Sequence, residues 1–170
     1  MKDDMKQTIL TIAMALAFAG TVNAQSLYQK VHDNATAVVN NAASNDQQIQ
    51  VNQFKITALN FIMTQVSKHG QTKTDYFYDS QAVNLASFIT DFETDVIKAN
   101  RISPAKRLAV IECYRNASLQ NPLFGDTDKE TAYCYVNDTK TYTPFSLDTD
   151  WEKAYTQASL KIKEILRSGQ

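Results

Sequence analysis

Glycine and proline are so scarce in this chain that it has few places to turn sharply. The sequence holds four glycines and three prolines among 170 residues. Sheets of many short strands need frequent turns, and those turns draw on these two amino acids. The scarcity therefore predicts an all-α fold, and the length fits one domain.

The first 24 residues have the order of parts found in a cleavable secretory signal peptide. After a charged start, an apolar run covers residues 9–20, and the small side chains of Val22 and Ala24 precede the expected cut. The run is shorter than the about 20 residues that cross a bilayer as a helix. We expect residues 1–24 to be removed. The mature domain would then span residues 25–170, periplasmic or secreted, with no membrane insertion after processing.

Apolar residues recur at steps of three or four along several segments, which is typical of amphipathic helices. Polar capping residues mark where these segments begin. The expected helices cover residues 26–43, 44–69, 80–100, 103–119 and 150 onward, with residues 70–79 as a loop. The expected caps are Ser26, Ser44 with Gln47, Ser103 before Pro104, and Thr149 with Glu152. Together they predict an antiparallel bundle of four to five helices.

Residues 131–145 break this pattern, because aromatic and threonine residues crowd around an Asn-Asp pair. Strand-forming runs at 131–136 and 141–145 favour a short hairpin inserted before the last helix. A short helix is the alternative, since residues 127–130 have the form of a capping box.

Both cysteines, Cys113 and Cys134, belong to the mature domain. An even number of cysteines in an oxidising compartment predicts a disulfide bond. Such a bond would tether the hairpin to the fourth helix and would be worth about 3 kcal/mol. Two free thiols are the alternative.

The aromatic residues of the insertion form the strongest functional signal. Tyrosines in a loop-rich segment are common at protein interfaces and on sugar-stacking surfaces. The same residues could instead form a small core that packs the insertion onto the bundle. The candidate interface consists of Tyr133, Tyr135, Tyr142 and Phe145.

A second candidate is an anion site at the turn between the third and fourth helices. Lys106 and Arg107 fall in the first turn of the fourth helix, where positive charge opposes the helix dipole. With Arg101 and the free amide groups of that turn, they could hold an anion. Solvated charges are the alternative interpretation.

Other constellations give weaker signals. His32 and His69 lack the spacing of metal or haem ligands, so no metal and no cofactor is predicted. A hydrolase acting on envelope material could use paired carboxylates, either Asp91 with Asp95 or a pair that includes Glu112. A small-ligand-binding bundle could use an uncharged stripe on the second helix. That stripe consists of Gln53, Thr57, Asn60 and Thr64.

The net charge of −1 argues against a nucleic-acid partner, because phosphate binding favours a basic surface. No nucleophile motif of the hydrolase type occurs in the sequence. The leading hypothesis is therefore a non-catalytic protein-binding module, such as an inhibitor, an immunity-type protein or an accessory subunit. Its partner would be another envelope or secreted protein.

Overall fold

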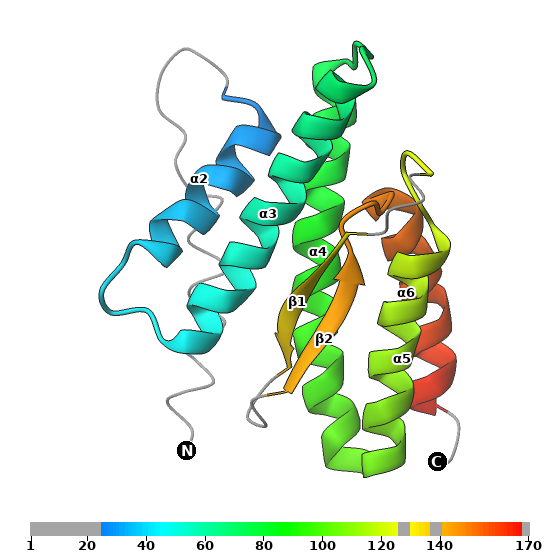
Figure 1. The fold of residues 1–170 in the computed structure, drawn as a ribbon. Coiled ribbons are helices and arrows are strands. Elements are labelled where there is room, and N and C mark those ends of the chain that lie inside the picture. Colours follow the sequence, from blue (N-terminus) through cyan, green and yellow to red (C-terminus); the bar gives the residue numbers. More distant parts are fainter. Residues whose placement is uncertain (1–24, 126–129, 137–140, 168–170) are drawn as a thin grey trace.

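Helices form most of the molecule, and a two-stranded hairpin lies across them (Figure 1). The computed structural model describes residues 25–125, 130–136 and 141–167, so the leader prediction falls outside the described residues. In chain order the elements are α2 (Leu27–Val39), α3 (Asp46–Lys68), α4 (Asp75–Ile102), α5 (Pro104–Gln120), β1 (Thr131–Val136), β2 (Thr141–Ser146) and α6 (Trp151–Arg167). The mostly helical bundle with a hairpin before the last helix is confirmed.

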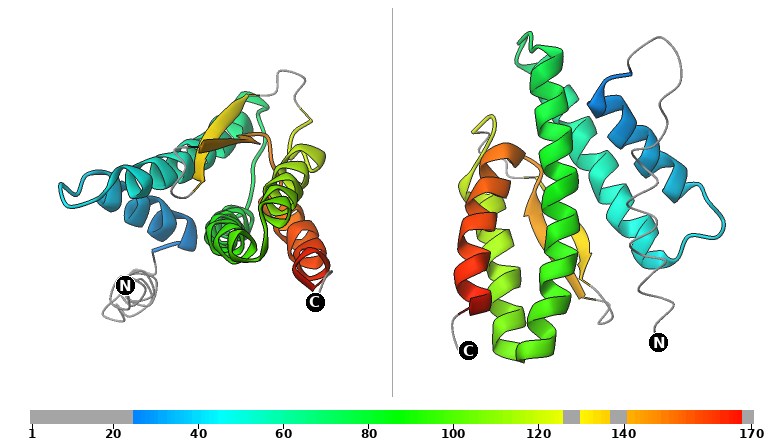
Figure 2. Two further views of the ribbon diagram at one scale, coloured as in Figure 1. Left: turned by 90° about the horizontal axis from the view of Figure 1, so that it is seen from below. Right: turned by 180° about the vertical axis from the view of Figure 1, so that it is seen from behind.

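The long helix α4 is the centre of the arrangement, since α2, α3, α5 and α6 all contact it. Viewed from the end, the hairpin lies across the molecule from α4 and bridges the space between α3 and α5 (Figure 2). Strand β1 contacts α3, and β2 contacts α5. The hairpin therefore closes the side of the bundle that the helices leave open.

Aromatic rings fill the space that the hairpin closes. The ring of Phe145 on β2 lies 5.2 Å from Phe92, 5.4 Å from Phe88 and 5.7 Å from Phe54, measured between centroids. Trp151, the first residue of α6, packs 5.3 Å from Phe88. All these pairs have the edge-to-face geometry that aromatic rings favour. The core thus joins α3, α4, the hairpin and α6.

Helix α4 begins earlier than the sequence predicts. The expected loop at residues 70–79 ends at Thr74, whose side chain accepts a hydrogen bond from the backbone of Phe77 and caps the helix. The added turn is held by packing, because the ring of Tyr78 meets the edge of Tyr28 on α2. The loop prediction is therefore wrong for residues 75–79.

The connection between α2 and α3 also differs from the prediction. Helix α2 ends at Val39, and the capping box of α3 pairs Asn45 with Gln48, one residue later than expected. Ser44 does not cap α3: the side chain of Asn45 accepts the backbone N–H of Gln48, and the Ser44 hydroxyl donates to the carbonyl oxygen of Val38 at 2.7 Å. The hydroxyl closes the end of α2 instead.

The remaining caps are partly confirmed. Ser26 caps α2, and Ser103 caps α5 with Pro104 in the first turn. At α6 the carboxylate of Asp150 accepts from the backbone of Lys153, so Asp150 is the cap. The predicted Thr149 hydroxyl instead contacts the Ser146 carbonyl oxygen at 2.6 Å.

The predicted disulfide bond is wrong, since Cys113 and Cys134 are both free and buried. Cys113 lies on α5, whereas Cys134 lies on β1, the strand that packs against α3. Strand β2 stands between them because it is the strand that contacts α5. The order of the strands therefore keeps the two thiols apart.

Within the described residues, no helix combines the length and the apolar character needed to cross a membrane.

Candidate functional site

The outward side of the hairpin is an aromatic surface. Tyr135 pairs with Tyr142, and Tyr133 pairs with Pro144, in the antiparallel register. Paired residues share one face of a sheet, as do residues two apart on one strand. We call these four residues the tyrosine face. The residues between them belong to the other face, which is buried.

The tyrosine face is open to a partner. Tyr133 is 59% exposed and Tyr142 is 44% exposed. The half-buried Tyr135 supports the surface, with its ring edge-on to Tyr142 at 5.6 Å between centroids. Three of the four predicted interface residues therefore share one surface.

Phe145 does not belong to that surface, which corrects the prediction. It points to the buried face of β2 and is fully enclosed. Its ring contacts and its lack of a polar group explain why it packs in the core. The interface interpretation and the core interpretation of the aromatic insertion therefore each apply to one side of the hairpin.

Beneath the hairpin lies a cluster of polar groups from three elements. Burial raises the pKa of the Cys134 thiol and lowers the pKa of Lys55 on α3. Burial also raises the pKa of Glu93 on α4, whose carboxylate accepts a hydrogen bond from Gln47 at 3.1 Å. A thiol with a raised pKa stays protonated and is a poor nucleophile. The Cys134 thiol is therefore not activated as a nucleophile.

The carboxylates considered for hydrolysis do not share a cleft. Asp91 accepts a hydrogen bond from the Tyr155 hydroxyl at 2.9 Å, whereas Glu112 pairs with Arg115 at 2.9 Å on the surface of α5. General acid–base catalysis on one substrate needs both groups within reach of it. The Asp91 contact joins α4 to α6, whereas the Glu112 contact lies within α5.

The basic turn between α4 and α5 has a structural explanation. The ammonium group of Lys106 donates to the carbonyl oxygen of Ile165 near the end of α6. Helices α5 and α6 run antiparallel, so the first turn of α5 faces the negative end of the α6 dipole. Positive charge at Lys106 is thus favourable without a bound anion. Arg101 is exposed, and Arg107 is half-buried.

The uncharged stripe on α3 does not line an interior pocket. Gln53, Asn60 and Thr64 are exposed, and the hydroxyl of Thr57 bonds to the helix backbone at Gln53. The stripe is the outer edge of α3. The structure therefore gives the ligand-binding hypothesis no cavity at this position.

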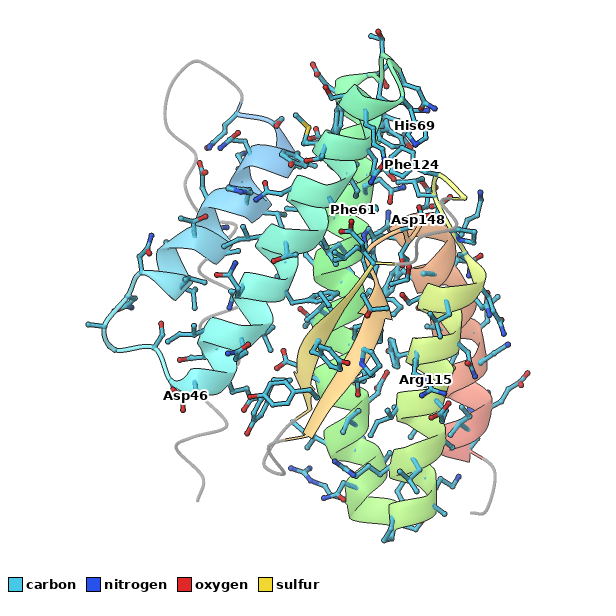
Figure 3. All side chains as sticks on the ribbon, in the orientation of Figure 1. Asp46, Phe61, His69, Arg115, Phe124 and Asp148 are labelled. Carbon is cyan, nitrogen blue, oxygen red and sulfur yellow. The ribbon has the colours of Figure 1, made fainter. Side chains whose placement is uncertain are left out.

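Neither histidine takes part in a metal cluster among the described residues. His69 stacks on Phe124 with centroids 5.7 Å apart, and Phe124 meets the edge of Phe61 at 6.4 Å (Figure 3). The carboxylate of Asp148 accepts from the backbone of Phe124 at 2.7 Å. These contacts tie the segment after α5 to the end of α3, which is a structural role.

Two surface hollows accompany these features. The larger, about 590 Å³, lies along α6 beside Asn121, the residue that follows α5; there Asp150 pairs with Lys153 at 2.9 Å and Asn121 donates to Gln157 at 2.7 Å. These four polar side chains thus already contact one another in pairs. The smaller, about 240 Å³, lies where α2 and α4 begin and includes the exposed Met63.

Comparison with known proteins adds no assignment: no protein-family model, no curated protein and no solved structure matches this chain.

Proposed function

We propose that this chain is an exported, non-catalytic protein-binding module and that the tyrosine face is its contact surface. The observation that carries the proposal is the exposure of Tyr133 and Tyr142 on a hairpin whose opposite face is part of the core. Large aromatic residues held at a surface are typical of the residues that dominate binding energy in protein interfaces.

The anchoring of the hairpin supports this proposal. Cys134 and Phe145 are fully buried, so the strands that carry the tyrosines are fixed before any partner arrives. A fixed surface loses little conformational freedom on binding, and a tyrosine ring has few rotatable bonds to immobilise. The face therefore needs no rearrangement to act as a binding surface.

The chemistry of the face indicates the kind of partner. Its four side chains offer apolar rings and tyrosine hydroxyls and carry no charge. A complementary protein surface would be apolar at its centre and would offer polar groups to the hydroxyls. Together with the expected export, this favours another envelope or secreted protein as the partner.

The alternative functions have less support from the described residues. The hydrolase hypothesis requires carboxylates that converge in an open cleft, yet Asp91 and Asp95 each accept a hydrogen bond from a tyrosine hydroxyl and Glu112 pairs with Arg115. The ligand-binding hypothesis requires an inward stripe on α3, yet most of that stripe is exposed.

The test begins with native mass spectrometry of the tagged protein from the envelope of the organism that encodes it. A co-purifying protein is identified, purified and titrated against the wild type. It is then titrated against the double variant Tyr133→Ala/Tyr142→Ala. We expect the double variant to bind about a hundredfold or more weakly, because one interface tyrosine can contribute ~2 kcal/mol.

The matched control is Tyr76→Ala, since Tyr76 is 78% exposed but lies at the start of α4, outside the tyrosine face. This control should bind like the wild type. Equal affinities for the double variant and the wild type would overturn the proposal. So would the same loss of affinity in the control variant.

A further inference from the structure

Gln25 is the first described residue and, if the leader is cut after Ala24, the first residue of the mature chain. It is exposed and directly precedes Ser26, the cap of α2. Its side-chain nitrogen Nε2 donates to the carboxylate oxygen Oδ2 of Asp33 at 2.6 Å. The side chain of an N-terminal glutamine is thus hydrogen-bonded to the carboxylate of Asp33 on α2.

We propose that Gln25 is a modification site, where the mature N-terminus closes into pyroglutamate with the help of Asp33. In this step the free α-amino nitrogen attacks the side-chain carbon Cδ, and a new C–N bond forms. The bond between Cδ and Nε2 breaks, and Nε2 leaves as ammonia. No oxidant, reductant or second reactant is needed. The inference rests on the proposed export, which creates the free amine.

The position of Asp33 suits the proton transfer that this step requires. When the amine has attacked, both nitrogens are bonded to the same carbon. A carboxylate next to Nε2 is then also close to the α-nitrogen. The carboxylate can accept a proton from the attacking nitrogen and return it to the leaving one, as a general acid–base group does. Asp33 is therefore assigned the role of proton carrier.

Neighbouring side chains hold the Asp33 carboxylate in place. Its second oxygen, Oδ1, accepts from the side-chain nitrogen of Gln29 at 2.7 Å. The ring nitrogen Nδ1 of His32 lies 3.8 Å from the same oxygen. These contacts leave Oδ2 directed at Gln25.

Ring closure also removes an unfavourable charge from the start of α2. The first turn of this helix contains no acidic residue of its own, so a protonated α-amine there faces the positive end of the helix dipole, which the Asp79 carboxylate of α4 offsets only in part. Pyroglutamate is uncharged. The product therefore fits the helix end better than the amine does, and it also lacks the free amine that aminopeptidases require.

The decisive experiment uses a fusion protein that a site-specific protease cuts immediately before Gln25. This gives every molecule the required N-terminus at a known time, without any enzyme of the host. Mass spectrometry of the N-terminal peptide then follows the loss of one ammonia with time. We expect the wild type to convert and Gln25→Ser to show no such loss at its N-terminus.

The role of Asp33 is tested by Asp33→Asn, with Asp46→Asn on the exposed start of α3 as the matched control. We expect conversion of Asp33→Asn to be about tenfold slower, a smaller effect than an acid–base group supplies in an enclosed active site. The control should convert like the wild type. Circular dichroism verifies that the variants keep their helices.

Two results would overturn the inference: a wild-type N-terminus that keeps its ammonia, or equal rates for wild type and Asp33→Asn. Export is judged separately, from the N-terminal peptide of the full chain expressed in a bacterium. A chain that still begins at Met1 there would refute export, while the fusion protein would still decide whether Gln25 closes.

Discussion

Phe145 is part of the core, although it belongs to strand β2, whose other face is exposed. Its ring is fully buried against three phenylalanines of α3 and α4. We expect Phe145→Ala to lower the free energy of unfolding by about 3–5 kcal/mol, the usual loss for a buried phenylalanine. Urea denaturation followed by circular dichroism measures this change.

Tyr133→Ala is the natural comparison, because Tyr133 lies on the same hairpin but on the exposed face. We expect its unfolding free energy to stay within about 0.5 kcal/mol of the wild type. A small loss in Phe145→Ala, or a large one in Tyr133→Ala, would contradict the assignment of the two faces.

The ionisation of Tyr28 predicts a loss of stability at alkaline pH. Its hydroxyl donates to the Leu59 carbonyl oxygen at 3.1 Å, and burial raises its pKa from 10.0 to about 12. The native state thus holds this proton more tightly than the unfolded chain does. The stabilisation is complete below pH 10.0 and is lost as the pH rises toward about 12.

Buried Tyr114 acts in the same direction, since burial and the charge of Asp95 raise its pKa as well. Urea denaturation over this alkaline range should therefore show a falling free energy of unfolding. We expect the fall to be shallower in Tyr28→Phe, which lacks the titrating hydroxyl. An identical slope in Tyr28→Phe and the wild type would refute the contribution of Tyr28.

At the scale of elements, α2 is the least anchored helix, with Ala35 as its buried residue. A polar contact with α4 helps to fix its start: the backbone of Tyr28 donates to the carboxylate of Asp79 at 2.8 Å. We expect Asp79→Ala to destabilise the start of α2 by about 1 kcal/mol, the usual cost of a lost cap. Hydrogen exchange should then accelerate in α2 and stay unchanged in α5.

Asp79→Asn is the control for this prediction because its amide keeps an oxygen that can accept the same hydrogen bond. Its exchange in α2 should resemble that of the wild type. Faster exchange throughout the molecule in Asp79→Ala would instead indicate a global loss of stability.

The sequence predicted those elements whose limits depend on residues close to one another in the chain. Ser103 with Pro104 and the hairpin of β1 and β2 are examples. The start of α4 at Asp75 was missed because its aromatic first turn is held by a contact with α2. Ser44 was misassigned because Ser44 with Gln47 and Asn45 with Gln48 both have the spacing of a capping box, and the structure uses the second pair.

At the scale of the whole molecule, the two buried thiols make a clear prediction. Both cysteines are free, and burial raises the pKa of each. We expect neither thiol to react with a thiol reagent in the native protein and both to react after denaturation. The intact mass should equal that of the reduced chain. A native mass lower by two hydrogens would contradict the free thiols.

The division of the candidate site into two faces could be predicted from the sequence, whereas the separation of the two cysteines could not. The alternation of a strand separates Tyr142 from Phe145, because residues three apart face opposite sides, so the sequence does contain the true division. The position of Cys134 depends on which strand meets which helix. That choice is a tertiary one, and no spacing of residues along the chain encodes it.

The late place of the hairpin in the chain has a consequence for the timing of folding. The aromatic faces of α3 and α4 are completed by Phe145 and Trp151, which are synthesised after four of the five described helices. A nascent chain cannot close its core until this distant segment has emerged, and contacts over such long sequence separations form slowly. If the chain is exported as proposed, this delay favours its arrival at a translocation channel before the core has closed.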